Sequence, residues 1–156
     1  GFAGGDRVDR HGHCEVNMAT IIDIANAVTA DVNRGSFDIE FTAVMMLLPE
    51  FELKDMKTLK VTVVPKAVKF ENMTRDTSSR EVQIDIGVQQ KTADSERIAA
   101  LLQLVEDIIA VFDRKRLTDY PSALCVKVAI DPIYDPEHLR QMRQFTSVIT
   151  LTFKVL

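Results

Sequence analysis

The final segment of the chain constrains the fold most, because its residues alternate with a period of two. Between Phe145 and Leu156, the apolar residues Phe145, Ile149, Leu151, Phe153 and Val155 alternate with Thr146, Thr150, Thr152 and Lys154. Such alternation, rich in β-branched and aromatic residues, predicts a half-buried β-strand. A strand of about twelve residues is roughly 40 Å long, which is long for a small domain. The sequence therefore predicts a sheet built on long strands.

Three other segments share this alternation, and two segments have apolar residues at helical spacing. In chain order, we expect a helix from an N-cap at Thr20 to Gly35, strands at Phe37–Leu47, Leu59–Val63 and Val82–Val88, a helix from Asp94 or Ser95 to Arg116, and strands at Leu124–Ile130 and Phe145–Leu156. Pro49 and Pro65 are expected to end the first two strands. The predicted class is α+β: two layers, with two helices covering a mixed or antiparallel sheet of about five strands, in the order α-β-β-β-α-β-β.

Composition limits the classes of function. The 156 residues fit a single domain, and 46% hydrophobic content suffices for a packed core. A net charge of −4 argues against a dedicated nucleic-acid binder. No apolar run approaches the roughly 18 residues of a spanning helix, so no membrane partner is expected. The two cysteines do not predict a disulfide framework.

Residues 1–17 differ from the rest of the chain. They are rich in glycine and charge and have no apolar period. They are interpreted as a natural flexible arm, as a tag, or as a mis-annotated leader. The last reading arises because Glu15–Met18 can be back-translated into a purine-rich ribosome-binding sequence followed by a start codon. In each case, residues 18–156 are expected to form the single folded domain.

The sequence offers little for catalysis or metal binding. His11, His13 and Cys14 lie close together, but in a segment that lacks the fixed scaffold of a structural metal site. Other candidates are His138, expected on the surface, Cys125, expected to be packed in a strand, and the carboxylates Asp85, Asp131 and Asp135, whose spacing marks no acid–base pair. We therefore predict no catalytic residue, cofactor site or metal site, and a protein that is not an enzyme.

One strand is expected to be apolar on both faces. Val44, Met46 and Leu48 lie on the face that begins with polar residues, and Val148 interrupts the polar face of the last strand. A strand apolar on both faces is buried on both. Either a hairpin loop folds over the second face, or a neighbouring subunit covers it with adaptable Met side chains at the contact. The second explanation makes Val44, Met46, Leu48 and Val148 the expected subunit interface.

The polar stretch Lys66–Ser79 is predicted to be an extended hairpin loop, unless Val68 and Phe70 prolong the second strand into it. It is far longer than the two to five residues usual for a hairpin connection. Loops held on a rigid sheet are where partner contacts concentrate. We therefore expect a docking loop, with contact residues Lys66, Lys69, Arg75, Asp76 and Arg80.

Several segments resemble a known family. They are the Ile-rich opening helix after Met18, the Leu-x-Val-x-Val-Val-Pro strand at Leu59–Pro65, and the segments Ile84–Gln90, Ile130–Leu139 and Arg143–Leu156. With the element order, they resemble the tail-terminator (tail-completion) proteins of long-tailed bacteriophages. The resemblance covers Met18 to Leu156, and no residue matches a specific contact of that family.

The resemblance implies a structural virion protein of the head–tail or neck region, assembled in the host bacterial cytoplasm. Such proteins form hexameric rings that cap the tail tube and face the head–tail connector. The implied partners are other copies of the chain, the tail tube protein and the connector or neck protein, with DNA passing through the lumen without specific binding. Two alternatives remain: another neck component, such as a head-closure or adaptor protein, or a non-enzymatic α+β module that binds a small molecule or regulates another protein.

Overall fold

The structure is a computed structural model that describes residues 19–47, 57–72, 78–92, 94–130, 136–137, 140 and 143–155. Its elements are α1 (Ala19–Arg34), β1 (Ala43–Met45), β2 (Lys60–Asn72), β3 (Ser78–Lys91), α2 (Ser95–Phe112), β4 (Ala123–Ile130) and β5 (Gln144–Val155). The strands form one sheet in the order β1-β2-β3-β5-β4. The pair β1–β2 is parallel and the other pairs are antiparallel. The predicted class, element order and mixed sheet are confirmed.

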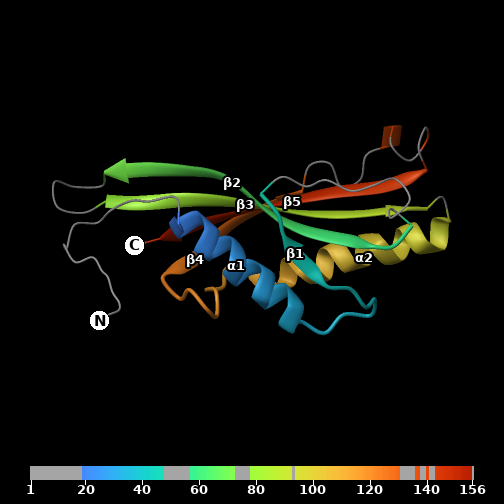
Figure 1. The fold of residues 1–156 in the computed structure, drawn as a ribbon, viewed down its shortest axis with the longest axis horizontal. Coiled ribbons are helices and arrows are strands. Elements are labelled where there is room, and N and C mark those ends of the chain that lie inside the picture. Colours follow the sequence, from blue (N-terminus) through green and yellow to red (C-terminus); the bar gives the residue numbers. More distant parts are fainter. Residues whose placement is uncertain are drawn as a thin grey trace.

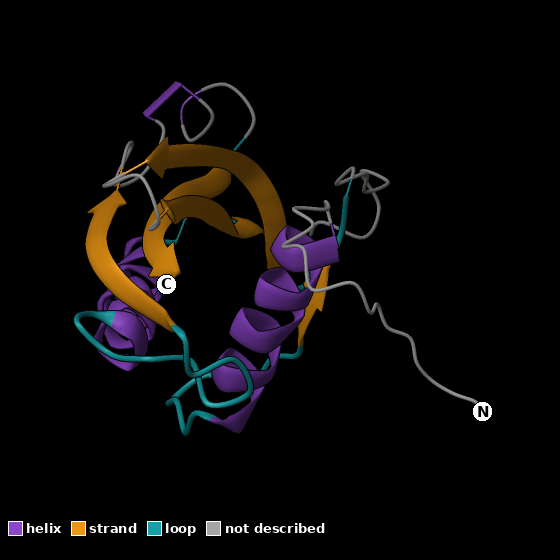
Figure 2. Cartoon of the chain, turned by 90° about the vertical axis from the view of Figure 1, so that its left-hand side faces the viewer, coloured by secondary structure: helices purple, strands orange, loops and turns teal. Residues whose placement is uncertain are grey.

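One hydrophobic core fills the space between the sheet and the two helices. The sheet is strongly curved, and both helices lie on its inner side (Figures 1 and 2). In α1, Ile24, Val28 and Val32 are buried at four-residue spacing, and α2 buries Leu101, Val105 and Ile108. Four consecutive even-numbered positions of β3 are also buried: Val82, Ile84, Ile86 and Val88. The apolar residues that recur at helical spacing in α1 and α2, and with a period of two in β3, therefore pack into a single core.

The helix ends follow local chemistry. The carboxylate of Asp94 accepts a hydrogen bond from the Glu96 amide at 3.1 Å, so the predicted N-cap of α2 is confirmed. The prediction for Thr20 was wrong, because α1 already begins at Ala19. The hydroxyl of Thr20 instead accepts a hydrogen bond from Arg80 at 3.2 Å.

The predicted first strand, Phe37–Leu47, is reduced to three residues in β1. A β-carbon at Gly35 would lie 2.6 Å from the Phe37 ring, so the glycine allows this ring to fold back against the end of α1. The rings of Phe37 and Phe41 then lie 5.3 Å apart. The alternating apolar residues here pack a loop against the core, and the alternation was misread as a strand.

The second strand does not stop at Pro65. β2 continues to Asn72, and its register against β3 shifts between Pro65 and Ala67. A bulge is one of the few places where a strand accepts proline, because the ladder is already interrupted there. The predicted loop over Lys66–Ser79 was therefore wrong in extent, since most of it is strand and only residues 73–77 lie outside the described residues.

Candidate functional site

The helix-free face of the sheet holds two of the four predicted interface residues in one row. Val44 pairs with Thr62, Thr62 with Gly87, and Gly87 with Val148. Val44 is 46% exposed, and Val148 is half-buried. The pairing therefore brings together residues that lie about a hundred positions apart in the sequence.

The middle of this row is tightly fitted. A β-carbon at Gly87 would lie 3.2 Å from the Thr62 hydroxyl oxygen, so the threonine side chain leans over the glycine. Thr62 is only 4% exposed. The exposed apolar surface of the row is consequently at its ends, where β1 and β5 contribute valines.

The other two predicted interface residues lie near or beyond the end of β1. The Met46 amide donates a hydrogen bond to the Val63 carbonyl at 2.9 Å, and its side chain is half-buried. Leu48 lies outside the described residues. Sequence reasoning did not select Leu47, which is 66% exposed. Leu47 lies between the expected interface residues Met46 and Leu48, which was a usable signal for its exposure. The alternation of the predicted strand instead indicated that Leu47 faces the core.

The predicted docking residues do not form one surface. Lys66 lies at the β2 bulge, with its ammonium 4.0 Å from the Asp85 carboxylate, which also accepts a 2.7 Å hydrogen bond from the Thr150 hydroxyl. Lys69 follows on the same face, in register with Glu81. Arg80 points to the opposite side, where its guanidinium contacts α1.

The remaining docking candidates, Arg75 and Asp76, lie outside the described residues. At the same end of the hairpin, Phe70 is 55% exposed. Sequence reasoning considered Phe70 only as a continuation of the second strand, and β2 does extend through it. Phe70 pairs with Arg80, whereas Lys69 pairs with Glu81, so Phe70 and Lys69 lie on opposite faces of the hairpin.

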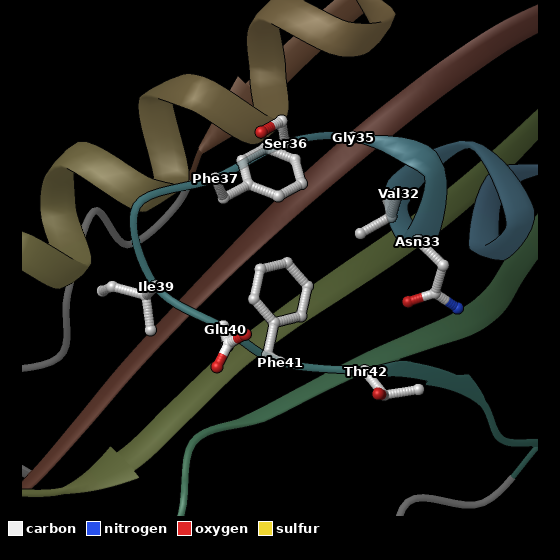
Figure 3. Close-up of a pocket in the computed structure, with 9 residues that line it drawn as sticks. All are labelled: Val32, Asn33, Gly35, Ser36, Phe37, Ile39, Glu40, Phe41 and Thr42. Carbon is white, nitrogen blue, oxygen red and sulfur yellow. The ribbon is translucent and has the colours of Figure 1, made fainter.

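A pocket of about 510 Å³ lies between the end of α1 and the segment that leads from it to β1, and it was not expected from the sequence (Figure 3). It is lined by Val32, Asn33, Gly35, Ser36, Phe37, Ile39, Glu40, Phe41 and Thr42. The Asn33 amide binds both backbone groups of Ala43, donating to its carbonyl at 3.0 Å and accepting from its N–H at 2.8 Å. This side chain replaces a neighbouring strand at that point of the sheet edge.

A second pocket, of about 490 Å³, is lined by residues of β1, of the segment before it and of the start of β2. Its apolar lining includes Phe41, Val44 and Met46, and its polar lining includes Gln90 and Arg97. The Arg97 guanidinium donates a 2.8 Å hydrogen bond to the Gln90 side chain. The end of the sheet around β1 is thus partly hollow and carries apolar side chains together with charged groups of both signs, Glu40, Lys60 and Arg97.

The candidates for chemistry are separated or lie outside the described residues. Cys125 is fully buried, as predicted, and burial raises the pKa of its thiol to about 11. Asp85 is engaged by Thr150 and Lys66. His11, His13, Cys14, Asp131, Asp135 and His138 are not among the described residues. Within the described ranges, no three His, Cys, Asp or Glu side chains gather as metal ligands.

No helix in the described part of the chain combines the length and apolar character needed to span a membrane. The exposed large apolar side chains of the described residues lie at the β1 end of the sheet (Val44 and Leu47), on the β2–β3 hairpin (Phe70) and on β4 (Val126).

Comparisons with known proteins give structural likeness without a match in sequence. No family model and no curated protein sequence matches the chain. Among similar solved structures is the PVC sheath/tube terminator of an extracellular contractile injection system, determined by cryo-EM in its extended state. The TM-score is 0.39 and the sequence identity is 16%. The match covers 90% of this chain, which spans 58% of the terminator chain.

Proposed function

We propose that this chain is a non-enzymatic structural protein of a phage-type tail, a tail terminator that forms a ring on the end of the tail tube. The observation that carries this proposal is the exposed apolar side chains at the β1 end of the sheet. Val44 is 46% exposed, and Leu47, three residues further on, is 66% exposed. Large apolar side chains exposed together at one end of a folded domain are typical of a protein contact site. Residues 18–156 resemble tail-terminator proteins in sequence, and we therefore assign this surface to contacts within a terminator ring.

The helix-free face is the proposed location of subunit contacts, through Val44, Met46 and Val148. Two helices are too few to cover both faces of a five-stranded sheet, so a neighbouring copy supplies the missing layer at this end. The end of the β2–β3 hairpin, with Lys69 and Phe70, is the proposed contact with the tube or connector. The net charge of −4 suits a lumen through which DNA passes without binding.

The test uses the full chain with tail tubes assembled from the tube protein of the same genome. Electron microscopy of the mixture should show a ring, expected to be six-fold, at one end of each tube, and tubes capped this way should stop growing. Val44→Glu should abolish the ring, whereas Glu106→Gln, on the exposed side of α2, should leave it unchanged. Tubes that grow equally with and without the protein, and carry no ring, would show that the terminator role is wrong.

The pocket bordered by Val44 and Arg97 favours a second candidate, a small-molecule-binding module. Its volume of about 490 Å³ lies within the range of small-molecule sites, and apolar walls with a few polar groups are typical of them. If the chain is such a module, it should stay monomeric and form no ring on tube ends. Its thermal unfolding midpoint should rise when a metabolite is added. Substituting Arg97→Ala should remove that rise. The two candidates are therefore separated by the same tube experiment.

A further inference from the structure

The second pocket contains a guanidinium group whose terminal nitrogens are unpaired. Arg97 lines this pocket of about 490 Å³, and its Nε atom donates a 2.8 Å hydrogen bond to the side-chain oxygen of Gln90. Gln90 lines the pocket too, so the guanidinium lies at the pocket wall. Within the described part of the chain, the two terminal nitrogens of Arg97 have neither a hydrogen-bond partner nor an ion-pair partner. They are therefore available as donors to an anion.

Gln90 holds this guanidinium in place. The side-chain nitrogen of Gln90 donates a 2.8 Å hydrogen bond to the Lys57 carbonyl, so both ends of the Gln90 amide are engaged. Arg97 is itself half-buried. An Arg side chain that is already held at Nε loses less conformational freedom when a ligand binds its terminal nitrogens. The pair is therefore preorganised to bind an anion.

The place of Arg97 in α2 also favours an anion. Arg97 lies in the first turn of the helix, which begins at Ser95. A helix N-terminus carries partial positive charge, so a cation in the first turn is unfavourable. Asp94 and Glu96 flank Arg97, but among the described residues neither carboxylate forms an ion pair with it. The stability of the helix therefore gives no reason for an Arg at this position, whereas an anion in the pocket does.

The rest of the pocket suits an apolar body. Its apolar lining consists of Phe41, Val44, Met46, Leu59 and Val61. Val44 is 46% exposed, so this wall can be reached from solvent. A pocket of this volume, with apolar walls and a few polar groups, is typical of small-molecule sites. The ligand that fits combines an apolar body with an anionic group.

The charges around the pocket favour a monoanion. One carboxylate, Glu40, and two cations, Lys60 and Arg97, line it, which gives a net charge of +1. Lys60 already has another interaction, so Arg97 is the cation left for a ligand. Glu40 is exposed and forms no ion pair among the described residues. A carboxylate carries one negative charge, whereas a phosphate ester carries nearly two at neutral pH and is repelled more strongly by Glu40.

We propose that this pocket binds a small monocarboxylate with an apolar body. The carboxylate accepts hydrogen bonds from the terminal nitrogens of Arg97, and the apolar body lies against Phe41, Val44 and Met46. This inference rests on the second candidate function and names the class of its ligand. Val44 and Met46 also belong to the proposed subunit contact, so binding is measured on the free chain, without tail tubes.

The experiment titrates the full chain by isothermal calorimetry, at a concentration at which it sediments as a monomer. The probes are octanoate, its shorter homologue butanoate, the uncharged octanol and octyl phosphate, all at neutral pH. Two variants change the anchor: Arg97→Gln removes the charge, and Arg97→Lys keeps the charge without the planar fork. The matched control is Arg114→Gln, at an exposed Arg just beyond α2 that does not line the pocket.

Octanoate should bind at least about tenfold more tightly than each of the other three probes. Butanoate buries less apolar area, octanol lacks the charge, and octyl phosphate is repelled by Glu40. Arg97→Gln should weaken octanoate binding by at least about tenfold, because charge-assisted hydrogen bonds are lost, and Arg97→Lys should weaken it by a smaller factor. Arg114→Gln should bind octanoate like the unaltered chain. Circular dichroism of each variant should match that of the unaltered chain, which excludes unfolding as the cause of a loss.

Three results overturn the carboxylate site, and they differ in what they leave standing. Equal affinity for octanoate and octanol, or octanoate binding that Arg97→Gln leaves unchanged, keeps the small-molecule module but removes the anionic anchor. Tighter binding of octyl phosphate assigns the pocket to a phosphate ester. Failure of every probe to bind removes both the carboxylate site and the pocket as support for the module. The presence or absence of rings on tube ends tests the terminator role separately.

Discussion

The helix-covered and helix-free faces of the sheet are built from alternate residues of the same strands, yet their side chains are held in different ways. On the covered face of β3, Ile84 and Ile86 are completely buried in the core. On the free face, their neighbour Asp85 is held by a hydrogen bond to Thr150 and an ion pair with Lys66. The covered face is therefore held by burial of apolar side chains, and the free face at Asp85 is held by polar contacts, which contribute less to the free energy of folding.

The largest difference between the faces is expected for neighbouring residues of β3. Ile84→Ala removes fully buried methyl groups and leaves a cavity, so the free energy of unfolding should fall by about 3 kcal/mol. Gln83→Ala, one residue earlier on the free face, should change it by less than about 1 kcal/mol. Urea unfolding of the two variants measures both values. Equal losses would show that the free face is also a packed layer in the isolated protein.

The second test concerns alkaline pH and the buried thiol of Cys125. Burial raises its pKa from an ordinary value of 9.0 to about 11, so the folded state disfavours the thiolate. Because the unfolded chain loses this proton first, the stabilising contribution is complete below about pH 9 and is lost as the pH rises toward 11. Relative to Cys125→Ala, the unaltered chain should lose about 2 kcal/mol over that interval.

The matched variant Cys125→Ala controls for other groups that titrate at high pH, since they are common to both proteins. Unfolding by urea at several pH values between 8 and 11 gives the comparison. Parallel stability curves for the two proteins would contradict a shifted thiol pKa. The covered face would then be less shielded from water than its burial indicates.

The smallest effect is expected for Asp85 on the free face. Asp85→Ala leaves the Thr150 hydroxyl without its 2.7 Å acceptor, and the free energy of unfolding should fall by about 1 kcal/mol. Thr150→Val should cost a similar amount, and the double variant should cost less than the sum of the two. A double-mutant cycle measures this coupling. Strictly additive losses would mean that the hydrogen bond contributes nothing to stability.

The comparison of the faces also explains which sequence predictions failed. Alternation of apolar and polar residues indicates that a segment has one apolar face and one polar face. It does not indicate what covers either face. Phe37 and Phe41 alternate like a strand, but they pack as a loop because the end of α1 lies beside them and Gly35 admits the Phe37 ring. Arg80 was grouped with Lys66 and Lys69 by sequence proximity. Its place in the register instead directs it to Thr20 of α1.

The contact surfaces could be predicted only in part. Val44 and Val148 were selected because each breaks a polar alternation, and that signal is local. Their common row depends on three pairings between distant segments, and the sequence contains no local signal for these. The pockets beside β1 and the Asn33 amide that closes its edge depend on how α1 ends against the sheet.

The sequence by itself determined the class of the fold, the order of its elements and the capping of α2 by Asp94. These features follow from periodicity and from hydrogen bonds within a few residues. Only the tertiary structure decided that β2 continues through Pro65 at a bulge and which strands form the edges of the sheet. Strand order and register depend on which distant segments pair with one another. That choice is set by how well each arrangement buries the whole core and not by a local preference of any segment.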